Sequence, residues 1–85
     1  MKVPVTEEDT PFVQGYQKEI NAKGGWVHTD YKAVEKWEQV VNGQNQIYHL
    51  SADEDFKCTV YLHLSNLIGA TWKVTRAEKG WTPIQ

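Results

Sequence analysis

The dipeptide Asn42-Gly43 constrains the fold of this chain more than any other local feature. It stands between Trp26–Val41, which is rich in aromatic and β-branched residues, and Asn45–Ser51, which is expected to form the return strand. Both residues tolerate a positive φ, which the tight turn of an antiparallel hairpin requires. The sequence therefore predicts a β-hairpin whose tip is the segment Gln39–Gly43.

The alternation of side chains predicts which residues share a face of this hairpin. In the first strand it places Tyr31, Ala33, Trp37 and Val41 on one face and Val34 and Val40 on the other. This alternation is imperfect, so a β-bulge is expected. In the return strand Ile47 is expected on one face, with Tyr48 and Leu50 on the opposite one.

Two further strands are expected after the hairpin, over residues 56–64 and 70–77, with turns over residues 52–55 and 65–69 and a tail over residues 78–85. Ahead of the hairpin, apolar residues at three- and four-residue spacing predict one helix of about 13 residues. Thr10 and Pro11 are expected to begin it and Gly24-Gly25 to end it. The stripe consists of Phe12, Val13, Tyr16 and Ile20.

Eighty-five residues correspond to one domain, and Met1–Asp9 is expected to form an extended arm. Consecutive hairpins give an antiparallel meander with one face for the helix to cover, so the predicted fold class is α+β over residues 1–85. The net charge of −2 argues against a nucleic-acid partner, and no run has membrane-spanning length.

Few residue patterns point to chemistry. Cys58 is the single cysteine, so no internal disulfide forms, and no Cys/His spacing suits zinc. Asp53, Glu54 and Asp55 lack the glycine and the spacing of a calcium loop and are expected to form a solvated turn. No cofactor or metal is expected. With no signal-peptide core at the start, a cytoplasmic location is the default, and a processed secreted chain stays open.

The predicted hairpin tip carries an unusual apolar pair. Val40 and Val41 precede the turn directly, with the polar residues Gln39 and Gln44 on either side of the tip. Apolar area at a solvent-facing tip suggests a surface that a partner covers. A plain hairpin turn that needs only Asn42-Gly43 explains the spacing equally well.

At these residues the chain resembles the stefins, the single-domain cystatins without disulfides. Gln39–Gly43 fits their Gln-x-Val-x-Gly loop motif, and Tyr31–Val34 is similar to the strand that leads into that loop. Asp53–Phe56 resembles a turn of that family, and Thr10–Gln14 resembles the start of its helix. These stretches follow the family order along most of residues 10–76.

The resemblance implies an antiparallel sheet of four or five strands wrapped around one α-helix. It also implies a reversible, competitive inhibitor of papain-like cysteine proteases of the cathepsin type, which blocks the active-site cleft as a wedge and has no catalytic residue. The implied protease-binding residues are Gln39, Val40, Val41, Asn42 and Gly43 in the first hairpin, Val3, Pro4 and Val5 in the arm, and Asn66, Leu67, Ile68 and Gly69 in the second hairpin.

The chain departs from the family pattern in two of the three segments. Its arm has Pro4-Val5 where the family has Pro-Gly, and its second hairpin is shorter and lacks the family proline. These departures keep open a cystatin-fold binding module with a non-protease protein target. The implied state is a monomer, with a domain-swapped dimer hinged at the first hairpin as the alternative.

A small enzyme is the remaining hypothesis. It would use Cys58 as nucleophile and His28, His49 or His63 as its base. A mid-strand cysteine is more often an inert, partly buried thiol. Of the four tryptophans, Trp26 and Trp37 are expected in the core or on a sheet face. Trp81 is expected to close the edge of the sheet or to contact a partner.

Overall fold

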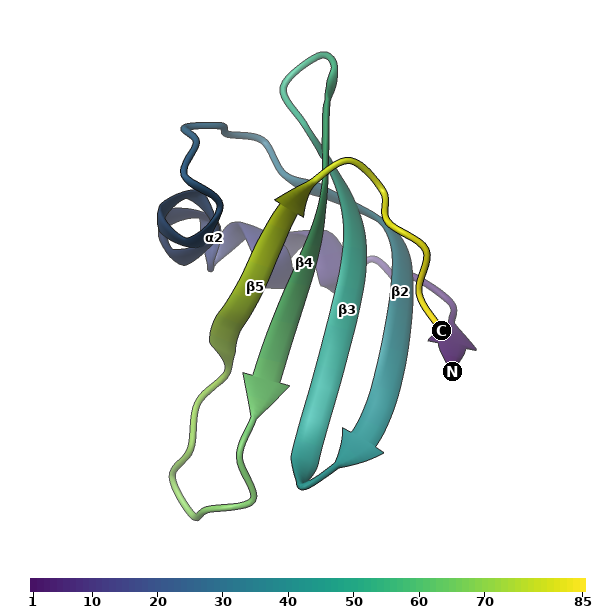
Figure 1. The fold of residues 1–85 in the computed structure, drawn as a ribbon, viewed down its shortest axis with the longest axis vertical. Helices are drawn as coiled ribbons and strands as arrows, with labels where there is room; N and C mark the ends of the chain where they lie inside the picture. The colour runs from purple at the N-terminus through teal and green to yellow at the C-terminus, as the bar shows by residue number, and fades with distance from the viewer.

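The computed structural model describes residues 1–85 as an α+β fold with five strands and two short helices (Figure 1). All neighbouring strands are antiparallel, and their order in the sheet follows the chain from β1 to β5. The elements are β1 (Lys2–Val3), α1 (Asp9–Gln14), α2 (Gln17–Gly24), β2 (Lys32–Val41), β3 (Gly43–Ala52), β4 (Phe56–Leu64) and β5 (Lys73–Lys79).

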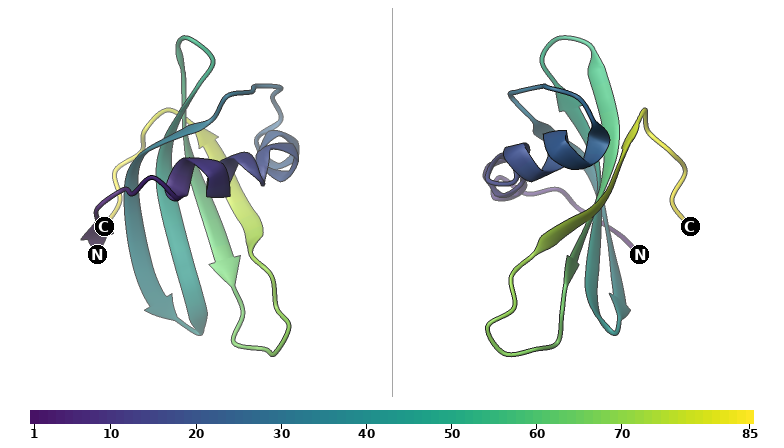
Figure 2. Two further views of the ribbon diagram at one scale, coloured as in Figure 1. Left: turned by 180° about the vertical axis from the view of Figure 1, so that it is seen from behind. Right: turned by 60° about the vertical axis from the view of Figure 1, so that its left-hand side comes forward.

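Three layers follow one another across the sheet. Figure 2 shows the helices on one face and the C-terminal tail crossing the other. The molecule measures 37 × 24 × 23 Å, and both long hairpins extend past the helices toward one end of its long axis. Neither helix has the length and apolar content needed to cross a membrane.

The predicted single helix is interrupted. The expected apolar stripe does face the core, with Val13 and Ile20 fully buried, but α1 ends at Gln14 and α2 begins at Gln17. At the break, the Tyr16 amide donates a hydrogen bond to the carbonyl of Val13, three residues earlier. An α-helix would instead pair it with the carbonyl four residues earlier. Gly15, which weakens a helix interior, marks this point.

The predicted start of the helix is also different. Thr10 does not cap it, because its hydroxyl accepts a bond from the Ala33 amide of β2 (3.1 Å). The helical turn begins at Asp9, and the Asp9 carboxylate accepts a hydrogen bond from the Thr6 amide (2.8 Å). The predicted end is confirmed: Gly25 adopts the left-handed conformation and donates its amide to the Asn21 carbonyl.

Residues 26–31 were expected to extend the strand but form an irregular connection, and β2 begins at Lys32. Side-chain hydrogen bonds replace strand pairing here. The Trp26 indole donates to the Tyr31 hydroxyl (2.8 Å), which donates to Asn21 (2.5 Å). Asn21 also bonds both the amide and the carbonyl of His28. The connection thereby closes one end of the core.

The expected bulge is confirmed, and it overturns part of the face assignment. The β2–β3 register shifts between Ala33 and Glu35, which inserts one residue and reverses the alternation. Ala33 packs against the core, whereas Trp37 contacts His49 on the opposite face. Ala33 and Trp37 therefore do not share a face. The assignment in β3 is confirmed, since Tyr48 and Leu50 join the core cluster and Ile47 does not.

The core lies between the helices and the central strands. Its fully buried members on the sheet include Tyr48 and Leu50 from β3 and Cys58, Val60 and Leu62 from β4. The predicted strand over residues 56–64 matches β4, whereas the last strand begins at Lys73, three residues later than expected. Residues 65–72 form a longer loop, and its Trp72 ring meets Phe12 edge-on at 5.8 Å.

The tail covers the second face of the sheet and does not close its edge, where Trp81 was expected. The Trp81 indole donates to the Leu50 carbonyl (2.9 Å), and its ring stacks on His49. The His49 imidazole lies 3.1 Å from Glu35 through Nδ1 and 2.7 Å from the Thr82 carbonyl through Nε2. Both partners are acceptors, so both bonds form together only when the ring carries two protons.

A buried carboxylate joins α1 to the sheet. Asp9 is 4% exposed and accepts a bond from the Tyr48 hydroxyl (2.7 Å), while Lys36 Nζ lies 3.0 Å from it. Burial works to raise the pKa of Asp9, but the bonds from Thr6, Tyr48 and Lys36 outweigh it and hold this pKa below its usual value. The cluster of Thr6, Asp9, Lys36 and Tyr48 is called the Asp9 cluster below.

Replacing Asp9 tests how much this cluster stabilises the fold. Asp9→Ala removes the closer carboxylate partner of Lys36 and leaves the buried Tyr48 hydroxyl without its acceptor on α1, so the free energy of unfolding in urea should fall by about 2 kcal/mol at pH 7. A carboxyl group whose pKa is lowered by folding stabilises the folded state fully at pH values above its unfolded-state pKa of about 3.9. This stabilisation is lost as the pH falls further. The difference between the wild type and Asp9→Ala should therefore shrink below about pH 4.

Glu7→Ala is the matched control, since Glu7 is an exposed carboxylate two residues away. It should change the unfolding free energy by less than about 0.5 kcal/mol. An equal effect of the two substitutions would contradict a special role for Asp9.

Candidate functional site

The β2–β3 hairpin ends in a turn of one unpaired residue. Strand pairing continues to Val41 and Gly43, so Asn42 alone forms the apex. Gly43 has a φ of 108°, as the turn prediction requires, whereas Asn42 keeps a negative φ. Val40 is 90% and Val41 52% exposed. The predicted apolar pair thus stands free at the tip.

The tip owes its exposure to the length of the two strands. β2 and β3 each have ten residues, and the helices cover only the part farther from the turn (Figure 2). Val40 occupies the helix-facing side of β2, but no helix reaches it. An apolar side chain placed there buries area only when another molecule covers it.

Polar side chains connect this hairpin to the neighbouring strand. Asn45 donates to Gln39 across β2 and β3 (3.3 Å), and its Oδ1 lies 2.7 Å from His63 Nδ1 on β4. A Cβ on Gly43 would lie 2.3 Å from the Leu64 carbonyl oxygen and 3.1 Å from the His63 ring. The hairpin tip therefore fits closely against the end of β4.

The second hairpin, between β4 and β5, ends beside the first. Its loop holds Leu67, which is 76% exposed, and Ile68, which is fully exposed. The Leu67 carbonyl accepts the Ala70 amide (3.1 Å), and Gly69 takes a positive φ to close this turn. The loop curls around a hollow of about 430 Å³ that His63 and Lys73 also line.

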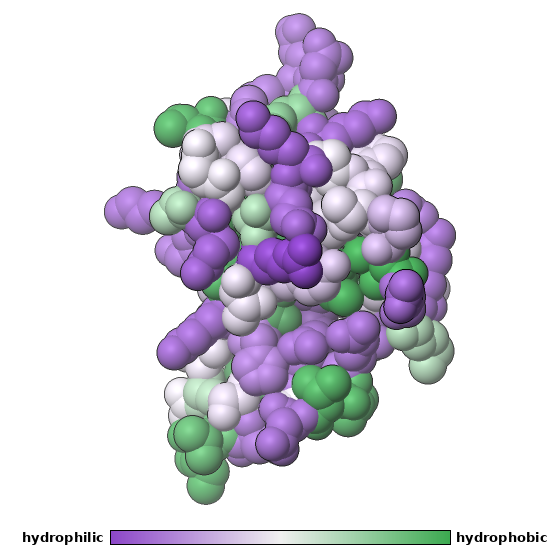
Figure 3. Space-filling view, in the orientation of Figure 1, coloured by the Kyte–Doolittle hydropathy of each residue, from purple (hydrophilic) through white to green (hydrophobic).

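The two tips lie at the same end of the molecule (Figure 1). In Figure 3 two apolar areas appear over these hairpin ends, with polar surface between them. Of the residues that the sequence implied for protease binding, the structure thus brings together Gln39–Gly43 and Asn66–Gly69. Together these two segments are called the hairpin end.

The arm residues lie apart from the hairpin end. Val3 pairs with Lys36 in the middle of β2, and Pro4 and Val5 continue from there toward α1. Met1 is the arm residue nearest to the tip, and it exchanges two main-chain bonds with Glu38 (2.8 and 2.9 Å). Met1 therefore lies beside Glu38, three residues before Val41 along β2.

The cysteine of the enzyme hypothesis lies in the core. Cys58 is fully buried, and this burial raises its pKa to about 12, so the thiol stays protonated near neutral pH. The histidines are engaged elsewhere: His28 with Asp53 (2.7 Å), His49 with Glu35 and His63 with Asn45. No group of three or more His, Cys, Asp or Glu side chains is arranged to hold a metal ion.

Sequence reasoning missed the part that His63 plays at the hairpin end. It considered His63 only as a base for Cys58, whereas the structure places it between the two hairpins. The spacing offered a signal, because His63 faces Asn45 once β3 and β4 pair around the turn at residues 53–55.

The chain was compared with protein-family models, with curated proteins and with solved structures, and none of the three comparisons gives a match.

Substituting Gly43 tests whether the close fit of the tip stabilises the hairpin. Gly43→Ala combines a disfavoured φ with a steric contact against Leu64, and we expect a loss of about 2 kcal/mol in unfolding free energy. Gly69→Ala is the control, because Gly69 also has a positive φ but open space around its Cβ. Its cost should stay near 1 kcal/mol. Equal losses in thermal unfolding would refute the contact.

Proposed function

We propose that this chain is a cystatin-type inhibitor that reversibly blocks papain-like cysteine proteases, including those of the cathepsin type. The observation that carries the proposal is the hairpin end, where two exposed apolar tips lie at the same end of one sheet. The sheet order, the helical segment between β1 and β2 and the Gln39–Gly43 motif agree with the cystatin resemblance.

In the proposed mechanism the hairpin end enters the active-site cleft. Val40 and Val41 from one tip and Leu67 and Ile68 from the other bury apolar area against the cleft walls. The polar row of Gln39, Asn45 and His63 holds the first tip in place before binding, which lowers the ordering cost of association. Substrate is excluded, and no covalent bond forms with the catalytic cysteine.

The wedge of the proposed inhibitor consists of the two hairpins. Val3 pairs with Lys36 in the middle of β2, and Pro4 and Val5 lead from there to α1, away from the hairpin end. The proposed contacts with the cleft therefore come from Val40, Val41, Leu67 and Ile68. A few side chains carry most of the binding energy of an interface, so substitutions at these tips should have a large effect.

The same observation favours a second candidate function. A cystatin-fold binding module whose target is not a protease would use the hairpin end but would need no arm in a cleft. The paired arm and its Pro4-Val5 sequence fit this candidate.

Titration against papain and a cathepsin tests the proposed function. Adding the protein should remove protease activity stoichiometrically and competitively with a peptide substrate, and the inhibitor should be recovered uncleaved after dissociation. Unchanged activity of both proteases at micromolar protein would exclude the inhibitor and leave the binding module.

The variant Val40→Asp/Val41→Asp tests whether the first tip makes the contact. Two carboxylates in an apolar cleft should raise the inhibition constant at least about tenfold, which corresponds to 1.4 kcal/mol. Unfolding free energy should change little, because both side chains are already exposed. Val27→Asp is the matched control, since Val27 is 87% exposed in the connection before β2. Equal inhibition by both variants would contradict the proposed contact.

A further inference from the structure

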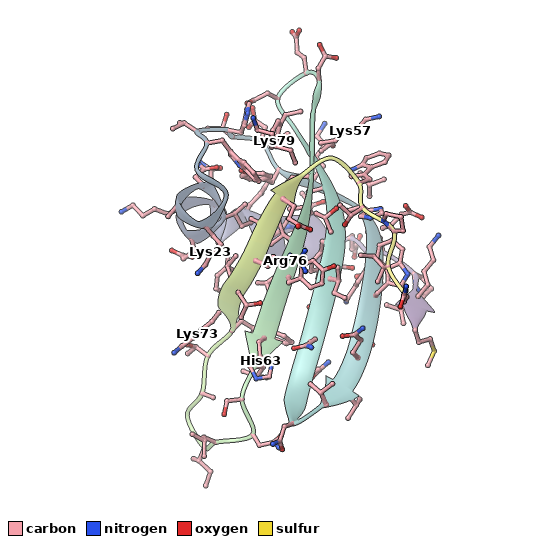
Figure 4. The ribbon with its side chains drawn as sticks, viewed as in Figure 1. Lys23, Lys57, His63, Lys73, Arg76 and Lys79 are labelled. Carbon is pink, nitrogen blue, oxygen red and sulfur yellow. The ribbon has the colours of Figure 1, made fainter.

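Basic side chains gather along the β5 side of the sheet. Four of the nine lysines and arginines lie there. Figure 4 labels these four, Lys23 on α2 and Lys73, Arg76 and Lys79 on β5. It also labels two residues of β4 that face away from this edge: Lys57, over the Trp81 ring, and His63, beside Asn45 of β3. The chain as a whole has a net charge of −2, so this concentration runs against its overall composition.

The cations occupy both faces of the sheet beside its β5 edge. Strand pairing places Arg76 opposite Tyr61, on the face that the tail crosses. Lys79 pairs with Cys58, whose side chain belongs to the core, so Lys79 lies on the helix face. Lys23 at the end of α2 adds a second cation on that face.

The outer edge of β5 has no strand beside it. The sheet order ends at β5, so the main-chain amides and carbonyls of this edge have no strand partner, while α2 packs against β5 on the helix face. A bulge at Thr75 bends the first part of the strand, and the Thr75 hydroxyl bonds the Tyr61 carbonyl (3.3 Å). The stretch from Arg76 to Lys79 pairs regularly with β4 and is therefore the straight part of the edge.

A peptide added to this edge as a strand would point alternate side chains toward the two faces of the sheet. Acidic side chains on one side of the peptide would then meet Arg76, and those on the other side would meet Lys79 and Lys23. Lys73, at the start of β5, lines the hollow between β5 and α2 together with Lys23 and Glu19. Glu78 is the only carboxylate on β5, and it pairs with Arg76 (2.6 Å), which has further N–H groups free to donate.

The charge distribution favours a short acidic peptide over a nucleic acid. Outside this region the chain has five lysines and arginines, against eleven aspartates and glutamates in the whole chain. A long polyanion that extended past β5 would meet repulsion there, whereas a short extended segment would contact only the basic edge.

We propose that the β5 edge binds an acidic, extended segment of a partner protein as a sixth strand of the sheet. This site is separate from the hairpin end and does not depend on the proposed inhibition of proteases.

Fluorescence anisotropy with short labelled peptides tests the proposal. The test peptide consists of Glu, Thr and Val, with glutamates placed so that both faces of the extended strand are acidic. It should bind in the micromolar range, whereas the same peptide with every glutamate replaced by lysine should not bind. An acidic peptide with proline at alternate positions keeps the charge but loses main-chain donors, so its affinity should fall at least about tenfold.

Matched charge variants of the protein locate the site. Arg76→Glu/Lys79→Glu should abolish binding of the acidic peptide. Lys2→Glu/Lys32→Glu makes the same change of charge at exposed positions on β1 and β2, at the opposite edge of the sheet, and should alter the affinity less than about twofold. Val40→Asp/Val41→Asp should bind the peptide like the wild type, which separates this site from the hairpin end.

Hydrogen exchange of the β5 amides gives a second measurement that does not depend on the variants. The acidic peptide should slow exchange at residues 76–79, because strand addition protects main-chain donors. Equal affinity for the proline-containing peptide, unchanged exchange in β5 at saturation, or tighter binding of an oligothymidine than of the acidic peptide would each overturn the proposal.

Discussion

The Asp9 cluster is the interaction on which the arrangement of this molecule depends. One carboxylate holds the first turn of α1 against β2 through Lys36 and against β3 through Tyr48. The helices are short and consecutive, so fixing the start of α1 also fixes where α2 crosses the sheet. Because the cluster lies beside the middle of β2, the helices leave the last residues of β2 and β3 uncovered.

The tail is the counterpart of the helices on the other face. Trp81 and Thr82 attach it to β3 through the Leu50 carbonyl and His49, and the Thr82 amide donates to Thr59 on β4. Burial on both sides makes the centre of the sheet a stiff platform. The hairpin end and the β5 edge are among the surfaces left open, and these two surfaces carry the two proposals.

Local patterns predicted much of the fold because they depend on nearby residues. Asn42-Gly43 located the hairpin, alternation gave the faces of β3, and Gly24-Gly25 gave the end of the helix. The errors arose where distant residues compete for the same group. Thr10 could not be recognised as a partner of Ala33 across 23 residues, and the reversal at the bulge moved Trp37 to the other face.

The candidate site shows the same division. The exposed pair Val40-Val41 was predictable, since it needs only the turn and the strand period. The position of the arm was not, because nothing local indicates that Met1 pairs with Glu38. The place of Trp81 was equally hidden, since it fills a position that exists only after β2 and β3 have paired around the bulge.

The projecting hairpin end has a consequence for how such a protein can change over time. Small domains have little stability to lose, so many substitutions that change a surface also unfold the domain. Here Val40, Val41, Leu67 and Ile68 contribute no area to the core, and substitutions at these positions leave the packed part of the sheet intact. The scaffold can therefore explore new targets by mutation at its tips, in natural lineages or in a library selected for binding.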